Sequence, residues 1–562
     1  MLFRVRTWGF ILAALTAGCS DDAGSASTET ESGDAGEATG TGGESGGMTT
    51  VGTTGAGPSG TTGGDDTDSD GTDGGETTGD TGEEPLEPST HFDRARQWSV
   101  PAGGWADQGF VRMGGSVSDP GDDDWTTLDL TGDGVPDLVV TSHWDGESFE
   151  VLGYGDAPHW DVYEGGTDGF ADSATAWTVP PGGWAEQGFV RVAGTVSDPG
   201  DDDWTTTDLN GDGFVDLVVT AHWDGEAFEV LGNGDTPHWD VYGGGPTGFA
   251  ASPTSWVVPA GGWAEQGFVR IAGTVSDPGD DDWVTTDLTG DGIPDLVVTA
   301  HWDGEAFEVL GNGGTPHWDV YEGGPGGFSA SAISWAVPGG GWADQGFVRS
   351  AGTVSDPGDD DWTTTDLTGD GVPDLVVTAH WDGESFEVLG NGGTPHWDVY
   401  QGGPNGFAAA ASAWSVPGGG WADQGFVRTA GTVSDPGDDD WVTTDLNADG
   451  IPDLIVTGHW DGEAFEVLGH GANPRWDLYM GSAEGFAQEP VAWAVPEGGW
   501  LDQGFVRVAG TVNDPGDDDW TTTDLNGDGY LDLIVTGHWD GRAFEVLGHG
   551  DAPYWRAFLG TP

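Results

Sequence analysis

Six short segments of the chain carry oxygen-bearing side chains at a spacing that suits a hard cation. In the segment Asp287–Asp295, such side chains occupy positions 1, 3, 5 and 9, and a glycine at position 6 allows a sharp turn. Ca²⁺ prefers oxygen ligands from loops of this kind, and the backbone carbonyl of position 7 can add another. An EF-hand would need helical flanks and Glu at position 12, where Val298 stands. The pattern predicts a calcium loop between two adjacent strands; the alternative is an acidic turn that only satisfies backbone donors.

These segments recur because the chain is built from a repeat. Equivalent Trp residues follow one another at a constant spacing of 79 residues: Trp98, Trp177, Trp256, Trp335, Trp414 and Trp493. Each copy holds short runs of Val, Thr, Trp, Phe and Tyr between Gly, Pro, Asp and Asn, which predicts four or five strands. A lone small sheet is marginal, and four-stranded repeats arranged radially form propeller blades. The sequence therefore predicts an all-β, six-bladed β-propeller, with a linear β-solenoid as the alternative.

The two ends of the repeat region complement each other. The first copy starts in the middle of the unit, at Phe92, which matches Phe170 and Phe249 of later copies. The last copy stops at Trp555–Phe558, which matches Trp318–Tyr321. We expect the N-terminal piece to supply the strand that the last copy lacks. A final blade shared between the two ends would close the ring and hide its edge strands.

The composition excludes some partners. Among 562 residues, 98 are acidic and 13 are basic, which gives a formal net charge of −85. Nucleic acid is a very poor partner for such a chain, because phosphate binding needs a basic surface. A single Cys permits no intramolecular disulfide, so an exported chain must gain its stability elsewhere, for example from bound metal.

The start of the chain is typical of an exported lipoprotein. Residues 1–18 read as a signal peptide, because Arg4 and Arg6 precede an apolar run that is too short to span a bilayer. The segment that ends in Cys19 resembles the lipobox of bacterial lipoproteins, which implies that this thiol carries the lipid. An ordinary signal peptide with a chance Cys is the alternative.

Two further segments follow the signal. Residues 19–90 are Gly, Thr, Ser, Asp and Glu with almost no large apolar side chain, so we expect a disordered tether. Residues 91–562 hold the repeats. The expected location is the outer membrane or the cell surface, with the membrane contacted only through the lipid anchor.

The repeated motif also resembles a known family. Asp-x-(Asn/Thr)-Gly-Asp-Gly-x-x-Asp-Leu followed by Val-Val-Thr is similar to the FG-GAP and VCBS repeats, and Val320–Phe328 is similar to their Gly-Phe end. These repeats form the β-propeller of integrin α chains and occur in bacterial surface proteins and some fungal lectins. The resemblance covers residues 92–560. It implies about six Ca²⁺ ions, one in each loop, at the rim between the first two strands of each blade.

The resemblance also implies the ligand set, namely the side chains at positions 1, 3, 5 and 9 of each loop. These are Asp129, Thr131, Asp133, Asp137, Asp208, Asn210, Asp212, Asp216, Asp287, Thr289, Asp291, Asp295, Asp366, Thr368, Asp370, Asp374, Asp445, Asn447, Asp449, Asp453, Asp524, Asn526, Asp528 and Asp532. Thr at position 3 is a weaker ligand than Asn or Asp, and Ala448 replaces a Gly in the fifth loop. We expect weaker binding in the loops with these departures.

Three other features are candidate sites. One Trp per copy lies in a Gly-rich segment, where it can stack on a sugar ring or pack inside the fold: Trp105, Trp184, Trp263, Trp342, Trp421 and Trp500. The acidic run Asp280–Asp282 can hold a second cation or form a solvated loop. The recurring His-Trp-Asp-Gly segment has only one His per copy, which is too few for a zinc site, and no nucleophile–base pair accompanies it.

Together these features predict a calcium-binding surface lipoprotein that acts as a binding or adhesion module and not as an enzyme. Its ligand is expected to be a carbohydrate or a protein on the propeller face. The alternatives are a purely structural envelope protein and a propeller enzyme that acts on polysaccharide.

Overall fold

The computed structural model describes the repeat region with short gaps. The described residues are 91–105, 123–153, 157–187, 202–232, 236–266, 281–311, 313–345, 360–390, 393–421, 439–460, 465–468, 474–498, 518–539, 542, 544–548 and 552–561. The expected signal peptide, the lipidation residue Cys19 and the tether lie outside these ranges.

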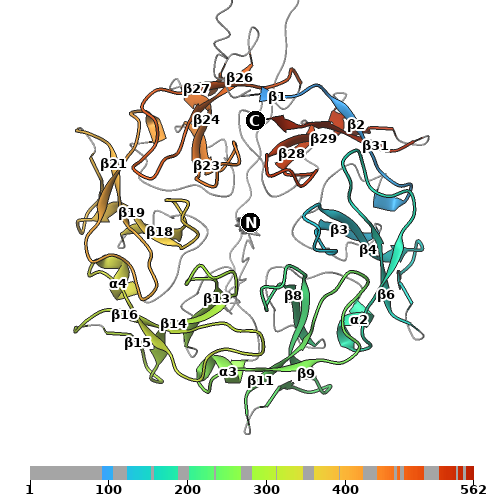
Figure 1. Ribbon diagram of the computed structural model, residues 1–562, viewed down its shortest axis with the longest axis horizontal. Coiled ribbons are helices and arrows are strands. Elements are labelled where there is room, and N and C mark those ends of the chain that lie inside the picture. Colours follow the sequence, from blue (N-terminus) through green and yellow to red (C-terminus); the bar gives the residue numbers. More distant parts are fainter. Residues whose placement is uncertain are drawn as a thin grey trace, which may run out of the picture. The chain divides into compact units, whose positions relative to one another are not determined.

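Six antiparallel sheets surround a common centre (Figure 1). In blade 1, the sheet runs outward from β3 (Asp124–Leu128) through β4 (Asp137–Trp144) and β6 (His159–Tyr163) to β7 (Thr175–Thr178). A short fifth strand, β5 (Phe149–Val151), pairs with the end of β4 and forms a hairpin with it. The prediction of a six-bladed, all-β propeller is confirmed.

The other blades repeat this arrangement. Blade 2 contains β8 (Asp203–Thr207), β9 (Asp216–Trp223), β10 (Phe228–Val230), β11 (His238–Tyr242) and β12 (Thr254–Val257). Blade 3 contains β13 (Asp282–Thr286), β14 (Asp295–Trp302), β15 (Phe307–Val309), β16 (His317–Tyr321) and β17 (Ile333–Ala336). Blade 4 contains β18 (Asp361–Thr365), β19 (Asp374–Trp381), β20 (Phe386–Val388), β21 (His396–Tyr400) and β22 (Ser412–Ser415). Blade 5 contains β23 (Asp440–Thr444), β24 (Asp453–Trp460), β25 (Phe465–Val467), β26 (Arg475–Tyr479) and β27 (Val491–Ala494).

Blade 6 joins the two ends of the repeat region. It contains β28 (Asp519–Thr523), β29 (Asp532–Trp539), β30 (Phe544–Val546) and β31 (Tyr554–Phe558), and its outermost strand is β2 (Arg96–Ser99). Across the β2–β31 pair, Trp98 lies opposite Trp555. The shared closing blade that the sequence predicts is therefore confirmed.

A contact that the sequence did not suggest reinforces this seam. The two-residue strands β1 (His91–Phe92) and β32 (Gly560–Thr561) pair with each other and extend the sheet of blade 5. Both ends of the repeat region are thus tied to the neighbouring blade as well as to blade 6.

Neighbouring blades are joined by a Gly-Phe segment that reaches back to the outer strand of the preceding blade. Phe249 lies edge-on against Trp160 and Trp177 of blade 1, with ring centroids 5.4 and 6.1 Å apart. Its backbone N–H donates to the Thr178 carbonyl at 2.9 Å. Gly248 has φ 144°, and a Cβ there would lie 2.7 Å from the backbone nitrogen of Thr178. The Gly-Phe pair is therefore required by close backbone approach and by aromatic packing.

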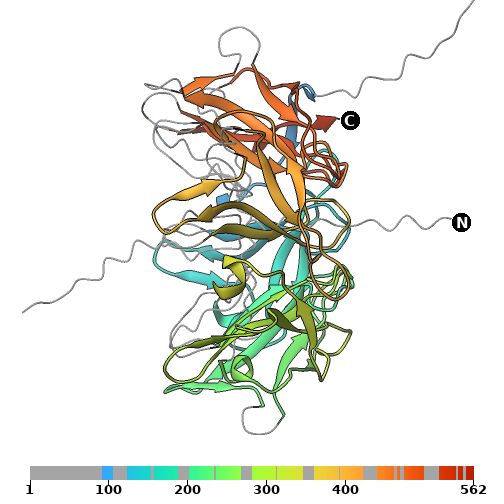
Figure 2. The same ribbon diagram turned by 90° about the vertical axis from the view of Figure 1, so that its left-hand side faces the viewer.

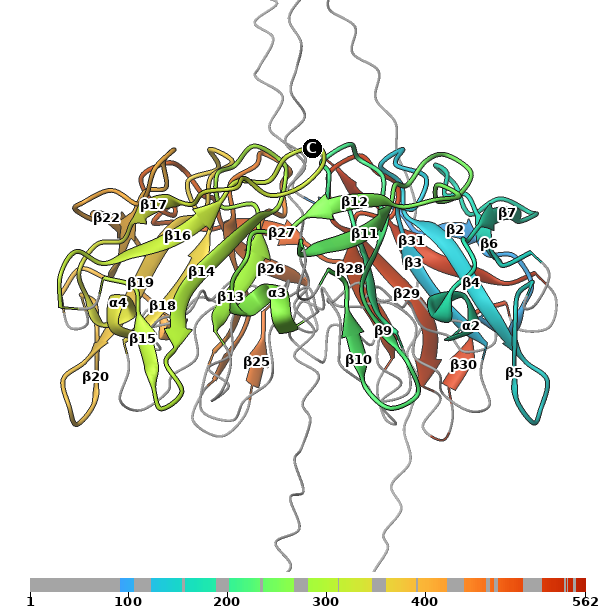
Figure 3. The same cartoon turned by 90° about the horizontal axis from the view of Figure 1, so that it is seen from below.

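The strands direct two kinds of loop to opposite sides of the ring. The second strand of each blade begins at the Asp-rich loop and ends in the hairpin formed with the short fifth strand. Figure 3 shows these hairpins projecting from one side, and Figure 2 gives the same arrangement edge-on. The one-turn helices α2 (Gly183–Gln187), α3 (Gly262–Gln266) and α4 (Gly341–Gln345) contact the fifth strand of the preceding blade. Within the described ranges, no helix has the length and apolarity needed to cross a bilayer.

Replacing Trp98 by Ala should open the ring. Trp98 is 1 % exposed, and truncating a buried Trp costs roughly 3–5 kcal/mol. Trp177, also 1 % exposed, is the matched control, because its strand is held to β6 by a continuous stretch of chain. We expect both variants to lower the melting temperature and only Trp98→Ala to raise the radius of gyration in small-angle scattering. An unchanged radius of gyration for Trp98→Ala would contradict the role given to the β2–β31 pair.

Candidate functional site

In each loop, the predicted ligand carboxylates at positions 1 and 9 hold the loop's own backbone. The two carboxylate oxygens of Asp287 accept hydrogen bonds from the N–H groups of Gly290 at 2.7 Å and Gly292 at 2.8 Å. Asp295 accepts from the N–H groups of Leu288 and Thr289 at 3.0 and 2.9 Å. Among the described residues, no group of three or more His, Cys, Asp or Glu is arranged around a metal position. The geometry is thus that of a tight acidic turn whose carboxylates bind backbone N–H groups.

Position 3 separates two kinds of loop. In the second loop, the Asn210 amide donates to both carboxylate oxygens of Asp216, at 3.2 and 2.9 Å. In the third loop, the buried Thr289 hydroxyl has no hydrogen-bond partner. The same is true of Thr131 and Thr368. A buried hydroxyl without a partner is costly, and a bound cation would give it one, so the residues fit a metal site.

The carboxyl group at position 9 is buried in every loop, which changes its protonation. Burial raises the pKa of Asp295 to about 6, and the charge of Asp287 adds to this effect. Burial raises the pKa of Asp532 to about 8, and the charges of Asp524 and Asp528 add to it. The loops thus gather like charges that disfavour one another, and a bound cation would offset this repulsion.

Neighbouring loops also touch, so that they form a continuous ring. A Cβ at Gly290 would lie 2.5 Å from the carbonyl oxygen of Gly371 in the next loop. A Cβ at Gly527 would meet the Gly134 carbonyl oxygen, which joins the last loop to the first. In the fifth loop Ala448 occupies this position with φ 59°, a strained backbone for a residue with a side chain.

Five of the Trp residues for which the sequence left stacking on a sugar or packing inside the fold are buried. Trp184 is 3 % exposed, and its indole N–H donates to the Pro180 carbonyl at 2.9 Å. Its ring lies against Tyr242 and His222, with centroids 5.5 and 6.2 Å apart. Trp105, Trp263, Trp342 and Trp421 are equally buried. The sixth, Trp500, lies outside the described residues. The burial of the five described rings favours the packing alternative over stacking on a sugar.

The hairpin contains the His-Trp-Asp-Gly segment, whose sequence fits neither a zinc site nor a catalytic pair, and it presents accessible aromatic side chains. In blade 2, Trp223 lies opposite Phe228 in the strand pair, with ring centroids 5.1 Å apart at 68°, and both side chains are partly exposed. On the other side of the hairpin, His222 lies opposite the exposed Glu229. An Asp-Gly turn between two strands could have revealed this two-sided ribbon in the sequence.

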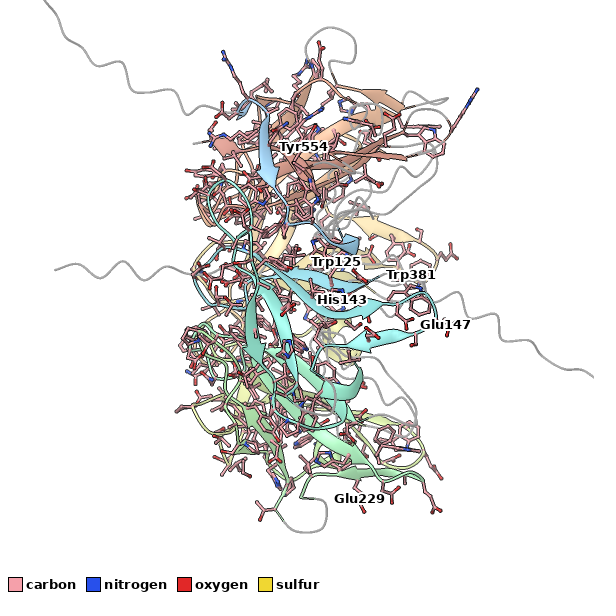
Figure 4. All side chains as sticks on the ribbon, turned by 90° about the vertical axis from the view of Figure 1, so that its right-hand side faces the viewer. Trp125, His143, Glu147, Glu229, Trp381 and Tyr554 are labelled. Carbon is pink, nitrogen blue, oxygen red and sulfur yellow. The ribbon has the colours of Figure 1, made fainter. Side chains whose placement is uncertain are left out.

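The turn of the hairpin is acidic, and its Asp side chain is hydrogen-bonded to the backbone of the turn. The Asp224 carboxylate accepts from the N–H groups of Glu226 and Ala227 at 2.7 and 2.8 Å, and these bonds lower its pKa. Glu226 and Glu229 are exposed. Figure 4 shows Glu147, Glu229 and Trp381, which belong to three different blades, on the same side of the ring.

The acidic run supports the base of the hairpin. Asp281 accepts from the N–H groups of Trp302 at 2.8 Å and Gly262 at 3.1 Å, and it lies 3.3 Å from the His301 ring nitrogen. The next residue, Asp282, is 1 % exposed at the start of β13. Asp280, the first carboxylate of the predicted second cation site, lies outside the described residues.

Comparison with known proteins gives structural likenesses only. No family model matches the chain, so the resemblance to FG-GAP and VCBS repeats stays a prediction, and no curated protein matches either. One similar structure is an Agrocybe aegerita lectin that recognises non-reducing terminal N-acetylglucosamine, with 18 % identity, TM-score 0.32 and coverage of 78 % of this chain and 80 % of that one. A Bacillus licheniformis rhamnogalacturonan lyase shows 11 % identity, TM-score 0.27 and coverage of 83 % and 76 %. TcdB2-TccC3 shows 16 % identity and TM-score 0.28, with 82 % of this chain spanning 15 % of that one. None of these likenesses bears on what this chain does.

Without divalent ions, the stability of the fold should fall as pH rises. Folding raises the pKa of the position-9 carboxyl from 3.8 to about 6 in Asp295 and about 8 in Asp532. At pH values between the unfolded and the folded pKa, the folded state binds more protons than the unfolded state. This stability is fully present below about pH 4 and is lost by pH 8. We expect the melting temperature of metal-free protein to decline across this range.

Repulsion among the many acidic residues also lowers stability as pH rises. A matched pair of variants therefore isolates the contribution of the buried carboxyl group. Asp532→Asn should flatten the decline, whereas Asp303→Asn, which changes an exposed hairpin carboxylate, should leave it unchanged. Equal slopes for the two variants would rule out the buried carboxyl as the cause.

The contact between loops predicts a difference between two glycines of one loop. Gly290 and Gly292 have φ 75° and 87°, so Ala at either position costs about 1–2 kcal/mol for the left-handed backbone. A Cβ at Gly292 meets nothing within 4 Å, whereas one at Gly290 meets the next loop. Denaturant unfolding should therefore show Gly290→Ala to be the more destabilising, and equal losses would argue against contact between the loops.

Proposed function

We propose that this chain is a calcium-stabilised, non-enzymatic binding module. It is exported and held outside the cytoplasm by a lipid on Cys19, and the hairpin side of its propeller binds carbohydrate. A purely structural envelope protein and a propeller enzyme that acts on polysaccharide remain the alternatives to be tested.

The observation that carries the binding proposal is the repetition of one two-sided hairpin around one side of the ring. Each of the first four copies combines a partly exposed indole with exposed carboxylates. Flat aromatic rings beside hydrogen-bonding groups suit sugar rings. An active site needs different groups that converge on one point, which six equal hairpins do not provide. Equal hairpins instead raise the avidity for a ligand that spans several of them.

Calcium is proposed for the loops on the other side of the ring. In the third loop, Asp287, Thr289, Asp291 and Asp295 would hold the ion, together with their counterparts in the other five loops. The partnerless Thr hydroxyls and the mutually repelling carboxylates support this assignment. A bound ion supplies positive charge, which stabilises the connection between the two inner strands of each blade.

Calcium removal should lower the stability substantially. A ligand present at 100 times its Kd stabilises the folded state by roughly 2.7 kcal/mol per site. We expect excess chelator to lower the melting temperature, and added calcium to restore it. Asp291→Asn should reduce the increase in melting temperature that calcium causes, and Asp303→Asn should not. A melting curve that is identical with chelator and with calcium would refute the metal proposal.

Carbohydrate binding can be examined with the mature chain on a glycan array at high calcium. Binding that is lost in a Trp223→Ala, Trp381→Ala double variant would support the hairpin side as the binding surface. An array without any hit would favour the structural alternative. Turnover in a broad glycosidase and lyase screen would favour the enzyme.

A further inference from the structure

We propose that the hairpins bind a polymer of amino sugars, in which each pyranose ring carries an ammonium group. This inference rests on the proposed function, because it names the ligand class of the same surface. Its ligand is chemically distinct from both neutral and acidic polysaccharides.

The aromatic side of the hairpin suits both parts of such a unit. A partly exposed Trp ends the second strand in all six copies: Trp144, Trp223, Trp302, Trp381, Trp460 and Trp539. The edge-on packing of Phe228 against Trp223, and of Phe386 against Trp381, fixes the orientation of these indoles. An indole face packs against the apolar face of a sugar ring and also attracts a cation.

The acidic groups of the hairpin supply the charge selection. In blade 2, the exposed Asp224 and Glu226 lie in the turn next to Trp223, and the described hairpin offers them no Arg or Lys. Hydrogen bonds from two backbone N–H groups lower the pKa of the exposed Asp224 and fix the position of its carboxylate. A neutral sugar would use the indole but leave the carboxylate charges uncompensated, whereas an ammonium group would use both.

The charge of the whole chain and its symmetry narrow the ligand further. A net charge of −85 repels polymers of uronic acids and attracts cationic ones. Near-identical sites are best matched by a ligand that itself repeats, because each repeat unit can then occupy an equivalent hairpin. The surface of a folded basic protein does not repeat, so it could not make the same contacts with several equivalent hairpins.

The sixth hairpin provides an internal contrast. Arg542 stands there in place of Glu147, Glu226, Glu305 and Glu384 of the first four hairpins. A positive charge at this position opposes an ammonium group. The sixth hairpin should therefore bind the proposed ligand more weakly, and Arg542→Glu should tighten binding.

The experiment compares three soluble probes on the full mature chain with calcium: a glucosamine hexamer, an N-acetylglucosamine hexamer and oligogalacturonate. We expect calorimetry to detect the glucosamine hexamer as the tightest ligand, with an affinity that falls as salt is added. Polylysine is the fourth probe, and it should bind more weakly because it lacks the pyranose ring.

Two matched double variants locate the site. Glu147→Gln with Glu226→Gln removes two charges from the hairpin side, and Glu164→Gln with Glu322→Gln removes two exposed charges from the opposite side. One exposed ion pair changes affinity roughly 1.4- to 5-fold, so the hairpin pair should weaken glucosamine binding between about 2- and 25-fold. The opposite pair should leave it unchanged, and equal melting temperatures confirm that both variants fold.

The outcomes separate this inference from the function on which it rests. Preference for the acetylated hexamer without salt dependence would overturn the amino-sugar inference and leave carbohydrate binding intact. Polylysine binding as tight as that of the hexamer would overturn the role of the sugar ring. Failure of every saccharide to bind would overturn both the inference and the carbohydrate part of the proposed function.

Discussion

The whole ring depends on one pair of short strands at its seam. Five blades take all their blade strands from one continuous stretch of chain, but blade 6 gains its outermost strand only when β2 joins β31, which places Trp98 opposite Trp555. The same closing segment sends Phe92 to the Trp pair of blade 5, with ring centroids 5.6 and 5.7 Å apart. Closure therefore leaves no blade without a neighbour to bury its aromatic side chains.

Closure also allows the two sides of the ring to differ. The Asp-rich loops lie close enough to touch, so their carboxylates accumulate where the backbone is most crowded. The hairpins project on the other side, where partly exposed indoles and ionised carboxylates remain accessible. The loop side thus carries negative charge within tightly packed backbone, and the hairpin side carries negative charge on exposed side chains. This separation is why the account assigns metal to the loops and ligand to the hairpins.

Much of this architecture could be predicted from the sequence, because its signals are periodic. The constant spacing of the Trp residues predicted the number of blades, and the partial units at Phe92 and Trp555 predicted a closing blade shared between the two ends. The pairing of β1 with β32 could not be predicted, since two-residue strands carry no pattern. For Trp184, the sequence left sugar stacking and packing inside the fold as two open alternatives. Its polar neighbours suggested a surface, but a one-turn helix and an indole bond to the Pro180 carbonyl turn the ring inward. The accessible aromatic side chains of the hairpin were not predicted either, because the Trp and Phe residues become neighbours only when the two strands pair.

The central claim is that the six repeated loops are metal sites and not merely acidic turns. Calorimetric titration of the chelated mature chain with calcium examines it most directly, because it counts ions without relying on any ligand of the hairpin side. The account predicts about six ions per chain, with weaker binding in the loops that carry Thr at position 3. Absence of any calcium binding would contradict it, and would leave six acidic turns, each with one buried carboxyl group, as the description of the loops.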